Sequence, residues 1–552
     1  MRHTPDLPVQ EFDYVIVGGG SAGCVLAGRL SEDPAVSVCL LEAGGPDDSV
    51  LIRAPLGFAA TATLGLHNWG FETVPQAGFK GRRGFAPRGK VLGGSSSVNA
   101  MVYTRGNPRD YDHWAALGNP GWSWQDVLPF FKKAEHFECA GAGDHRGVGG
   151  PLNVCFLPSP SPLNQAFEQA CEGRGIPRTP DYNGQQQFGV GRAQVTQKNG
   201  ERWNAARAYL TPHLQRPNLT VISQAEASRV LLEGRRAVGV EYRVGKKGAQ
   251  TERTVRARRE VLLAAGAYGS PQLLMLSGLG APAQLQAHGI AAVHALPGVG
   301  HNLQDHLSAV LIYRNRQPET TLGFSLAGGR TMLAAVQQWR RQRSGWLTSN
   351  VSESQAFVTT EARPEHPDIQ LALCTAIIDD HTRQRHWGHG YTLHVTLMRP
   401  QSRGSVRLQG ADPAAAPLID PAFFSAPDDM ARLVKGTQLG LDIMAEAALS
   451  AYRGPLLYPV NRDDPAQIAD FLRDHSDTEY HPVGTCKMGP TTDPLAVVDA
   501  QLRVHGIAGL RVVDASVMPC LVSGNTNAPT IMLAEKTADM IRTSFRSAEV
   551  IR

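Results

Sequence analysis

Two polar segments in the last part of the chain contain residue types suited to acid–base chemistry on a small substrate. Residues 481–489 read HPVGTCKMG and residues 523–530 read SGNTNAPT, compositions that favour specified turns over regular helix or strand. His481 offers an imidazole that could take a proton, and Asn525 offers an amide N–H that could hold an oxyanion. These two side chains are the candidate catalytic pair. The alternatives are a structural histidine and an asparagine that caps a turn.

A glycine-rich segment near the N-terminus has the pattern of a dinucleotide-binding turn. Residues 18–23 read GGGSAG, and they lie between a short apolar run at 12–17 and apolar residues at helical spacing to residue 30. The next apolar run, 36–41, is followed by Glu42. In such a βαβ unit a pyrophosphate approaches the helix N-terminus and the acidic residue binds ribose hydroxyls. The alternative is a glycine turn without a ligand.

Composition limits the classes of protein to consider. The 552 residues are too many for one simple core and predict two joined domains. The 54 basic and 50 acidic residues are too balanced to indicate nucleic-acid binding. The eight cysteines form no CxxC pair, and we find no secretory signal and no membrane-spanning apolar run, so the expected location is the cytoplasm. A basic stretch, Lys246–Arg259, predicts a solvated hairpin or, alternatively, a contact with an anionic membrane.

Further segments extend the cofactor-binding part of the fold. An apolar run at 260–265 predicts a strand that leads through a Gly- and Pro-containing turn into a helix from Gln272. Residues 510–513 predict another strand, and residues 531–542 have the apolar spacing of a helix.

The predicted fold class is α/β (α+β), with a Rossmann-like domain built from discontinuous segments and a substrate domain with an antiparallel sheet backed by helices. Alternating residues at 391–395 and 404–408 predict the antiparallel strands of the second domain. The predicted limits are 1–160, 200–315 and 475–552 for the dinucleotide-binding domain, and 161–199 and 316–474 for the substrate-binding domain.

With its ordered motifs at 18–23, 87–101, 266–274 and both C-terminal segments, the chain resembles the glucose–methanol–choline (GMC) oxidoreductases, which are FAD enzymes. The resemblance covers nearly the whole length. It is strongest to the branches of choline dehydrogenases and of FAD-dependent alcohol dehydrogenases from alkane-oxidising bacteria. It implies that His481 is the catalytic base, that Asn525 is its partner, and that hydride passes from the alcohol to flavin N5.

The resemblance also implies which residues contact FAD. Val98 stands where some relatives attach FAD through a histidine, so we expect non-covalent FAD. The implied FAD contacts are Gly18, Gly20, Ser21, Ala22, Gly23, Glu42, Ala43, Trp69, Arg88, Val91, Gly93, Gly94, Ser95, Asn99, Ala100, Met101, Val102, Ala227, Ala265, Gly266, Asp514, Ala515, Asn525, Thr526 and Asn527.

The substrate is less closely specified. Glu353, Arg399 and Tyr480 are the candidate substrate contacts. A primary aliphatic or aromatic alcohol is favoured, with electrons passing to quinone or another acceptor. A quinone acceptor would place the protein at the inner face of a membrane. The alternatives are choline as substrate, an oxidase that uses O₂, and a non-redox lyase of the same family. The sequence does not give the oligomeric state.

One short polar segment could be interpreted as a metal site. His301, Asp305 and His306 are close together in the sequence, and their side chains are metal-ligand types. The family has no metal, so we expect this segment to pack near the cofactor instead.

Overall fold

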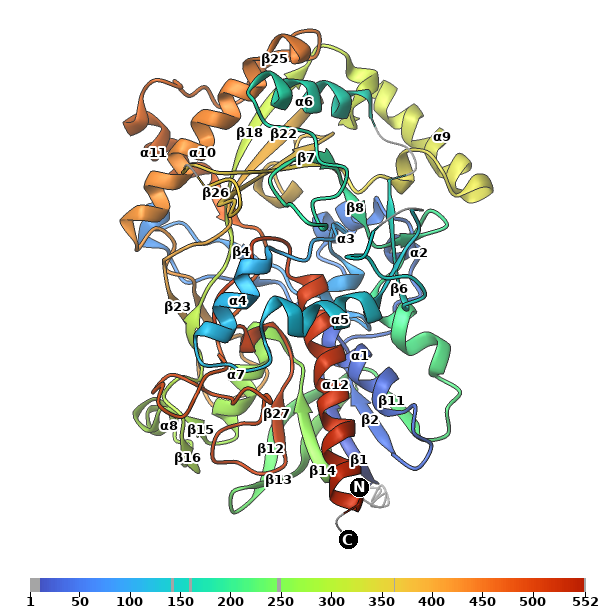
Figure 1. The fold of residues 1–552 in the computed structure, drawn as a ribbon, viewed down its shortest axis with the longest axis vertical. Helices are drawn as coiled ribbons and strands as arrows, with labels where there is room; N and C mark the ends of the chain where they lie inside the picture. The colour runs from blue at the N-terminus through green and yellow to red at the C-terminus, as the bar shows by residue number, and fades with distance from the viewer. Residues whose placement is uncertain (1–9, 140–142, 158–160, 246–249, 362, 551–552) are drawn as a thin grey trace.

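The computed structural model describes residues 10–139, 143–157, 161–245, 250–361 and 363–550. It is elongated, with one sheet towards each end of the long axis and both chain termini at the same end (Figure 1). Two large buried clusters, one at each end, form the main cores of the molecule. The predicted α/β class is confirmed.

A seven-stranded sheet forms the end that carries the termini (Figure 1). Its strands β11, β2, β1, β14 and β27 are parallel, while β12 and β13 are antiparallel additions that continue from β14. The predicted βαβ unit is confirmed as β1, α1 and β2. In spatial order the strands are β11 (Leu219–Ile222), β2 (Val38–Leu41), β1 (Gln10–Val17), β14 (Thr251–Leu263), β13 (Arg236–Val244) and β12 (Ala225–Glu233), with β27 (Leu510–Val512) on β14.

Helices from opposite ends of the sequence cover this sheet. In Figure 1, α1 and α12 lie side by side, and a buried ion pair of 2.7 Å between Arg29 and Glu535 joins them. The predicted C-terminal helix begins four residues earlier than expected, so the end of the second polar segment is helical rather than a turn. The helices of this half are α1 (Ser21–Leu30), α4 (Pro108–Ala116), α5 (Trp124–Ala134), α7 (Gly266–Leu276), α8 (Pro282–Ala287) and α12 (Asn527–Val550).

Helix α7 begins at Gly266, not at Gln272 as the proline at 271 suggested. Two groups outside the helix make the earlier start favourable. The Asp514 carboxylate accepts a hydrogen bond from the Gly266 N–H at 2.9 Å. The Thr485 hydroxyl donates to the Ala267 carbonyl at 2.7 Å, the carbonyl that Pro271 leaves without its usual helical donor. The proline is therefore tolerated because a distant residue replaces its missing N–H.

An eight-stranded antiparallel sheet forms the other end of the molecule. Helices α6, α10 and α11 pack around it, while α9 projects to one side (Figure 1). The strands are β25 (Arg453–Leu456), β18 (Leu307–Asn315), β22 (Gly388–Leu397), β21 (Ile369–Cys374), β20 (Ser352–Val358) and β7 (Gly189–Arg192), with β19 (Gly323–Phe324) on β22 and β26 (Ser476–Thr478) on β18. The helices are α6 (Pro162–Gly173), α9 (Leu326–Gln342), α10 (Pro427–Ala445) and α11 (Pro465–His475).

Short elements connect the two halves. The expected strand at 404–408 is β23, but it belongs to a separate small sheet with β17 and β24. The small strands are β17 (His301–Leu303), β23 (Gly404–Arg407), β24 (Leu418–Asp420), β5 (Glu135–Phe137), β6 (Leu152–Phe156), β8 (Gln194–Val195), β3 (Phe71–Glu72), β4 (Phe85–Ala86), β9 (Gln197–Lys198), β10 (Glu201–Arg202), β15 (Leu279–Gly280) and β16 (His294–Ala295). The short helices are α2 (Val50–Arg53), α3 (Gly57–Leu64), η1 (Ala77–Phe79), η2 (Gly94–Ser97), η3 (Ala206–Leu210), η4 (Thr211–His213), η5 (Pro318–Thr320), η6 (Trp346–Thr348), η7 (Asp380–Thr382), η8 (Ala447–Leu449) and η9 (Ala515–Val517).

The domain limits stay a prediction, although the sheets bear on two of them. Strand β18 lies before the predicted limit at 315 but pairs in the eight-stranded sheet, and so does β26, which lies after the predicted limit at 475. The chain therefore enters the eight-stranded sheet earlier, and leaves it later, than the sequence pattern suggested. The predicted basic hairpin is present as the β13–β14 pair, although residues 246–249 at its tip lie outside the described residues.

Candidate active site

A cavity of about 930 Å³ extends from one sheet to the other. At one end it is lined by residues at the carboxyl ends of parallel strands, including Val17, Leu41 and Ala264. At the other end it is lined by Gln355 and His394 of the eight-stranded sheet. Ligands of open α/β sheets bind outside the carboxyl ends of the strands. The fold therefore brings a dinucleotide-type site and a second binding surface into one continuous space.

The start of α1 is open to this cavity. Its N-cap is Gly20, no side chain caps it, and its first turn contains no acidic residue, while Ser21 and Ala22 line the cavity. A β-carbon on Gly94 would approach the Gly20 α-carbon to 2.7 Å, so only glycine allows the two loops to meet there. Unpaired N–H groups at a helix N-terminus attract a phosphate. This cradle fits the pyrophosphate of a dinucleotide.

Glu42 lies beside the same loop, directly after β2. Its two carboxylate oxygens accept hydrogen bonds from the backbone N–H groups of Gly19 at 2.8 Å and Gly44 at 2.7 Å. Burial raises the pKa of Glu42 to about 7, even though both hydrogen bonds favour the charged form. The carboxylate is held rigidly on the cavity wall, where it fits the ribose hydroxyls of a dinucleotide.

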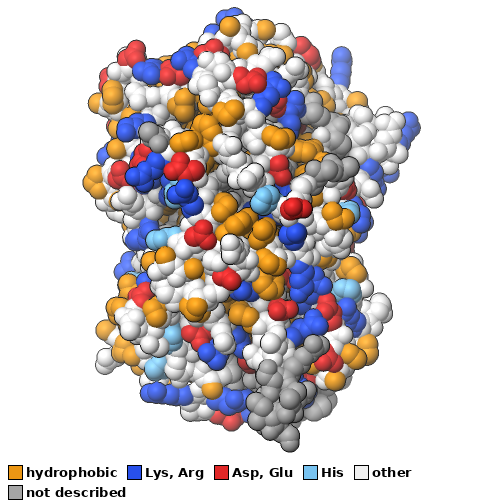
Figure 2. Space-filling view, in the orientation of Figure 1, with side chains coloured by type: hydrophobic (Ala, Val, Ile, Leu, Met, Phe, Trp, Pro, Cys, Tyr) orange, Lys and Arg blue, Asp and Glu red, His pale blue; other side chains and the backbone are white. Residues whose placement is uncertain are grey.

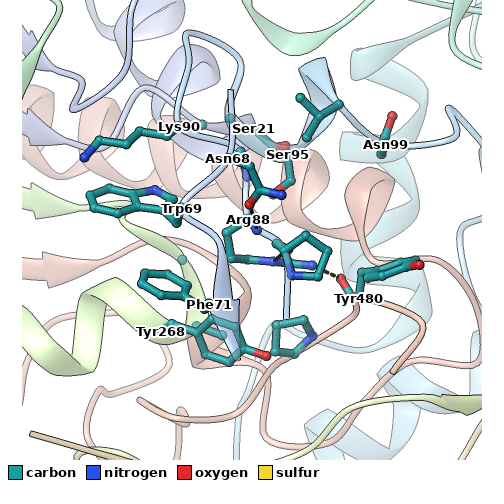
Figure 3. A pocket seen from close by; sticks show the side chains of 18 of the residues that line it. Ser21, Asn68, Trp69, Phe71, Arg88, Lys90, Ser95, Asn99, Tyr268 and Tyr480 are labelled. Carbon is teal, nitrogen blue, oxygen red and sulfur yellow. Dashed lines mark hydrogen bonds between the residues drawn. The ribbon is translucent and has the colours of Figure 1, made fainter. Parts of the chain in front are cut away.

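Aromatic side chains line the middle of the cavity (Figure 3). Trp69 stacks on Phe71 with ring centroids 5.6 Å apart, and Phe71 meets the edge of Tyr268 at 6.0 Å. Lys90 lies 3.8 Å above the Trp69 ring and forms an ion pair of 2.8 Å with Glu226. These fixed planar and charged groups give the cavity the mixed surface that a large flat cofactor requires.

The structure brings nearly all the sequence-predicted cofactor residues to the cavity wall. Gly23, Val91 and Gly93 are the three that do not line it. Gly23 has a supporting role, because a β-carbon there would come within 1.8 Å of the Gly18 carbonyl oxygen. The predicted residues on the wall are Gly18, Gly20, Ser21, Ala22, Glu42, Ala43, Trp69, Arg88, Gly94, Ser95, Asn99, Ala100, Met101, Val102, Ala227, Ala265, Gly266, Asp514, Ala515, Asn525, Thr526 and Asn527.

His481 and Asn525 meet on this wall although 44 residues separate them in the sequence. The Asn525 amide nitrogen lies 3.1 Å from His481 Nε2. On the other side of the ring, His481 Nδ1 lies 3.0 Å from Nδ1 of the buried His306. The candidate catalytic pair is therefore assembled, and a third side chain that sequence reasoning linked to a metal or to cofactor packing supports it.

The contacts of His306 define which nitrogen of His481 carries a proton. His306 Nε2 faces the carbonyl oxygens of Met398 at 2.9 Å and Val522 at 3.1 Å, so it must be the N–H donor. His306 Nδ1 is then an acceptor, and His481 donates to it from Nδ1. His481 Nε2 keeps its lone pair and accepts from the Asn525 amide. The unprotonated nitrogen of His481 is thus Nε2, which faces Asn525 and the cavity.

Both imidazoles are neutral at physiological pH. Burial lowers the pKa of His481 well below its usual 6.5, and the adjacent His306 lowers it further. Burial likewise lowers the pKa of His306 to about 4. A neutral imidazole with an exposed lone pair is the form that a general base requires.

The backbone around His481 is fixed by buried polar side chains. The Asp305 carboxylate accepts a hydrogen bond from the His481 N–H at 2.8 Å and another from the Thr478 hydroxyl. Tyr480 has φ +67°, a left-handed conformation, and its carbonyl accepts from the Arg88 guanidinium, as the dashed line in Figure 3 shows. Sparsely populated backbone conformations persist where the surroundings hold them, and they concentrate at functional sites.

The orientation of Asn525 is set by a chain of amide side chains that no sequence pattern indicated. Gln370 Nε2 lies 3.5 Å from Asn525 Oδ1 and donates to Gln355 Oε1 at 2.8 Å. Gln355 in turn donates to Ser352 at 2.8 Å. With its oxygen facing Gln370, Asn525 presents its N–H groups to His481 and the cavity.

A partly exposed ion pair occupies the neighbouring wall. His394 Nδ1 lies 2.6 Å from Glu479 Oε1, and both residues line the cavity. Burial by itself would lower the pKa of His394, but the Glu479 charge outweighs it and raises that pKa well above 6.5. The pKa of Glu479 is lowered to about 2, because the imidazolium outweighs the opposite effect of burial. The pair is therefore charged but neutral in sum.

The three predicted substrate contacts separate in the structure. Tyr480 lines the cavity, but Glu353 and Arg399 do not. Strand β20 has a register irregularity between Ser352 and Ser354, and the Glu353 carboxylate there accepts from the Ser161 backbone N–H at 2.7 Å. Arg399 donates to two carbonyls, those of His366 and Pro367. These placements do not support the substrate role expected of the two residues.

Comparisons with known proteins agree with this geometry. Residues 12–308 and 400–534 match the two sequence profiles described as GMC oxidoreductase. The chain is 45% identical over 533 residues to an alcohol dehydrogenase [acceptor] of Pseudomonas putida, with 96% of this chain and 95% of the relative covered. It is 44% identical over 540 residues to the mitochondrial choline dehydrogenase of Homo sapiens, with 96% and 90% covered.

Solved structures with the same fold are also similar. Pyridoxine 4-oxidase from Mesorbium loti superposes with a TM-score of 0.86 at 34% identity, over 96% of this chain and 99% of that chain. Formate oxidase from Aspergillus oryzae RIB40 has a TM-score of 0.89 at 26% identity, over 98% and 99%. That formate oxidase structure was solved to study FAD modification, which supports FAD as the cofactor of this cavity.

Proposed function

Because the chain belongs to the GMC oxidoreductase family, whose members act on CH–OH donors, we propose that it oxidises a primary alcohol to the aldehyde. The contact between His481 Nε2 and Asn525 is the observation that supports this most directly. It provides a proton acceptor and an N–H donor at one point on the wall of a cavity that fits FAD.

The proposed reaction assigns one task to each residue of the pair. His481 Nε2 takes the hydroxyl proton of the alcohol, and the imidazolium that forms then stabilises the negative oxygen. Asn525 donates an amide N–H to the same oxygen. When bound, FAD supplies the two-electron acceptor that the protein's own residues lack. His306 keeps His481 in the tautomer that the first step needs.

We propose that FAD is held without a covalent bond. Val98 lines the cavity, and its alkyl side chain has no nucleophilic atom that could bond to the flavin. The glycine loops, Glu42 and the aromatic wall would then provide the whole of the binding free energy. Denaturation in acid, followed by filtration, is expected to release all the flavin from the protein.

A neutral alcohol is favoured over choline. The acidic side chains on the described cavity wall are Glu42, Glu226, Glu479 and Asp514, and only Glu479 belongs to the end with the eight-stranded sheet. Its charge is already matched by His394, so a quaternary ammonium would meet no unpaired carboxylate there. Choline stays the second candidate because choline dehydrogenases are among the similar relatives.

We further propose an electron acceptor other than O₂. The support is that one similar relative is named for an alcohol dehydrogenase that uses an unspecified acceptor. Other relatives are named oxygen-dependent choline dehydrogenases. A quinone is the class of acceptor we favour. Reoxidation of the alcohol-reduced protein in air, compared with reoxidation by a soluble quinone, separates the two acceptors.

The experiment is anaerobic reduction of the purified yellow protein by 1-octanol, benzyl alcohol or choline in separate cuvettes. Loss of the flavin absorbance with 1-octanol or benzyl alcohol, and not with choline, is the expected result. Bleaching by choline alone would favour the second candidate. A protein that keeps its flavin but is bleached by no alcohol would contradict alcohol oxidation and favour a non-redox lyase.

A further inference from the structure

Helix α9 is held to the molecule by a narrow strip of its surface. It projects from the end of the molecule that carries the eight-stranded sheet (Figure 1). Only Ala335 and Trp339 are buried, with 3% and 4% of their surface exposed. One helical turn separates them, so they form a single line of contact. Most of the remaining helix surface faces outward.

The outward surface is apolar where solvent would favour polar residues. Leu326 is 82% exposed, Leu333 is 72% exposed and Val336 is 37% exposed. Leu326 and Leu333 are seven residues apart and lie on the side away from Ala335 and Trp339, whereas Val336 lies at the edge of that exposed side, next to the buried strip. Large apolar side chains gathered on one exposed face indicate an interaction site.

Two exposed aromatic residues extend this apolar face. Phe324 precedes the helix and forms a backbone bridge with Trp387. Phe324 is 57% exposed and Trp387 is 72% exposed. We use the term α9 face for Phe324, Leu326, Leu333, Val336 and Trp387. Tryptophan at the edge of an apolar surface is characteristic of membrane–water interfaces.

All the charged side chains of α9 are positive. Residues 326–342 contain Arg330, Arg340 and Arg341 and no aspartate or glutamate. Within the described residues, Arg343 at the end of the helix pairs with Glu201 at 3.2 Å, whereas no ion pair includes Arg330, Arg340 or Arg341. Figure 2 shows basic side chains at the rim of the projection at the upper right, where α9 lies in Figure 1. The apolar face is thus flanked by free positive charge.

The α9 face is connected to the cavity through one buried cluster. Ala335 and Trp339 pack with Leu56, Val351 and Cys374, and the last two line the cavity. On α3, Phe58 packs against the same cluster, and it also lines the cavity. Whatever covers the α9 face therefore lies next to one wall of the site.

We propose that the α9 face docks on an anionic phospholipid bilayer, with α9 lying in the headgroup layer. A short helix with leucine, aromatic residues and unpaired arginines matches interfacial membrane binding. Within the described chain, no helix combines the length and hydrophobicity needed to cross a bilayer, so the contact is peripheral. This surface is distinct from the basic hairpin at β13 and β14, which lies in the other half of the molecule.

The charge pattern favours lipid over a second copy of the chain. A twofold interface places the same surface opposite itself. Arg330, Arg340 and Arg341 would then approach their own counterparts with no acidic residue on the helix to separate them. Anionic headgroups instead supply the missing negative charge. The two occupants therefore make opposite predictions for the effect of removing these arginines.

The test is flotation of the FAD-loaded protein with vesicles of phosphatidylcholine, with and without phosphatidylglycerol. The wild type is expected to bind only the anionic vesicles. Replacing all three arginines by glutamine is expected to lower the partition coefficient about fivefold per residue, the equivalent of about 1 kcal/mol for each basic residue. L326D/L333D is expected to abolish binding. Val293→Asp and Arg253→Gln, exposed positions in the other half, serve as matched controls.

Turnover of a water-soluble alcohol and the oligomeric state by light scattering are measured in parallel. Retained turnover together with lost vesicle binding supports the proposal, because the variants are then folded. Absence of wild-type binding to anionic vesicles overturns it, and so does loss of binding in Arg253→Gln but not in the α9 variants. A wild-type dimer that L326D/L333D converts to monomer also overturns it, since a second copy then occupies the face.

Discussion

Two histidines on the same cavity wall have opposite charge. His481 and His394 are both shielded from solvent, and burial by itself would make both neutral. The hydrogen-bond partners of the His481 ring are an amide and another imidazole, so burial keeps the ring neutral. His394 contacts the Glu479 carboxylate at 2.6 Å and is therefore charged. Thus the neighbouring group, and not burial, assigns one histidine to proton transfer and the other to an ion pair.

The strongest test of this contrast is removal of the neutral histidine. His481→Ala is expected to lower the rate of flavin reduction by alcohol by about 10² to 10⁴, because no other residue at that point accepts the proton. Flavin content should be unchanged. Stopped-flow absorbance under anaerobic conditions measures the rate, with His113→Ala, an exposed position on α4, as the control. Equal rates in the wild type and His481→Ala would show that another group is the base.

Asn525→Ala removes the N–H donor at the same corner. A loss of about 10² to 10³ in the reduction rate is expected, because the developing negative oxygen loses a preorganised hydrogen bond. Asn525→Asp is the matched variant. It also removes the donor, but its carboxylate should raise the pKa of His481 and move the acid limb of the rate profile to higher pH. An unchanged limb would mean that residue 525 does not contact His481 in the working enzyme.

In the ion-pair region the expected effect is on stability. Glu479→Gln should lower the free energy of unfolding by about 1 to 2 kcal/mol, because the partly exposed His394 loses the carboxylate that stabilises its charged form. E479Q/H394Q should recover part of this loss. Urea unfolding of the wild type, both single variants and the double variant gives the coupling energy. Strictly additive losses would contradict a charged pair.

His306 permits a test of the tautomer argument. His306→Leu removes the acceptor for His481 Nδ1–H and is expected to reduce the rate by about tenfold to a hundredfold, the range typical of a residue that orients a functional group. His306→Gln keeps an acceptor oxygen and a donor N–H, so it should retain most of the rate. If both variants lose rate equally, packing and not the tautomer is the role of His306.

The smallest expected effect is on pH dependence, which should differ between the region around His481 and the region around His394. The pKa of His481 is lowered, so kcat/KM should be constant above pH 6.5 and fall only below it. The folded protein also binds fewer protons at His306 than the unfolded chain between pH 6.5 and about 4, so stability falls as pH decreases there. His394 has the opposite sign, because its raised pKa gives stability that is present at low pH and lost as pH rises through that value. Comparing the pH-dependence of unfolding in His306→Gln and His394→Gln measures both slopes.

Local patterns were the most reliable part of the prediction. The strand, glycine turn, helix and Glu42 lie within one short stretch, so neighbouring residues fix their geometry, and the structure reproduces it. The start of α7 at Gly266 was missed for a related reason. Thr485 donates to the Ala267 carbonyl across 218 residues of sequence, and no local pattern contains that contact.

The sequence by itself determined the family through its ordered motifs and the dinucleotide-type loop through residues at short spacing, and it indicated His481 and Asn525 through their residue types and the family resemblance. Only the tertiary structure decided which histidine carries a charge and which side chains line the cavity wall. His306 reaches His481 across 175 residues, and Glu479 reaches His394 across 85. Glu353 is held away from the cavity by hydrogen bonds from Ser161 and Asn164, whereas Glu479 lines the end of the cavity with the eight-stranded sheet. Charge state depends on contact distance, and contact distance is a property of the folded chain.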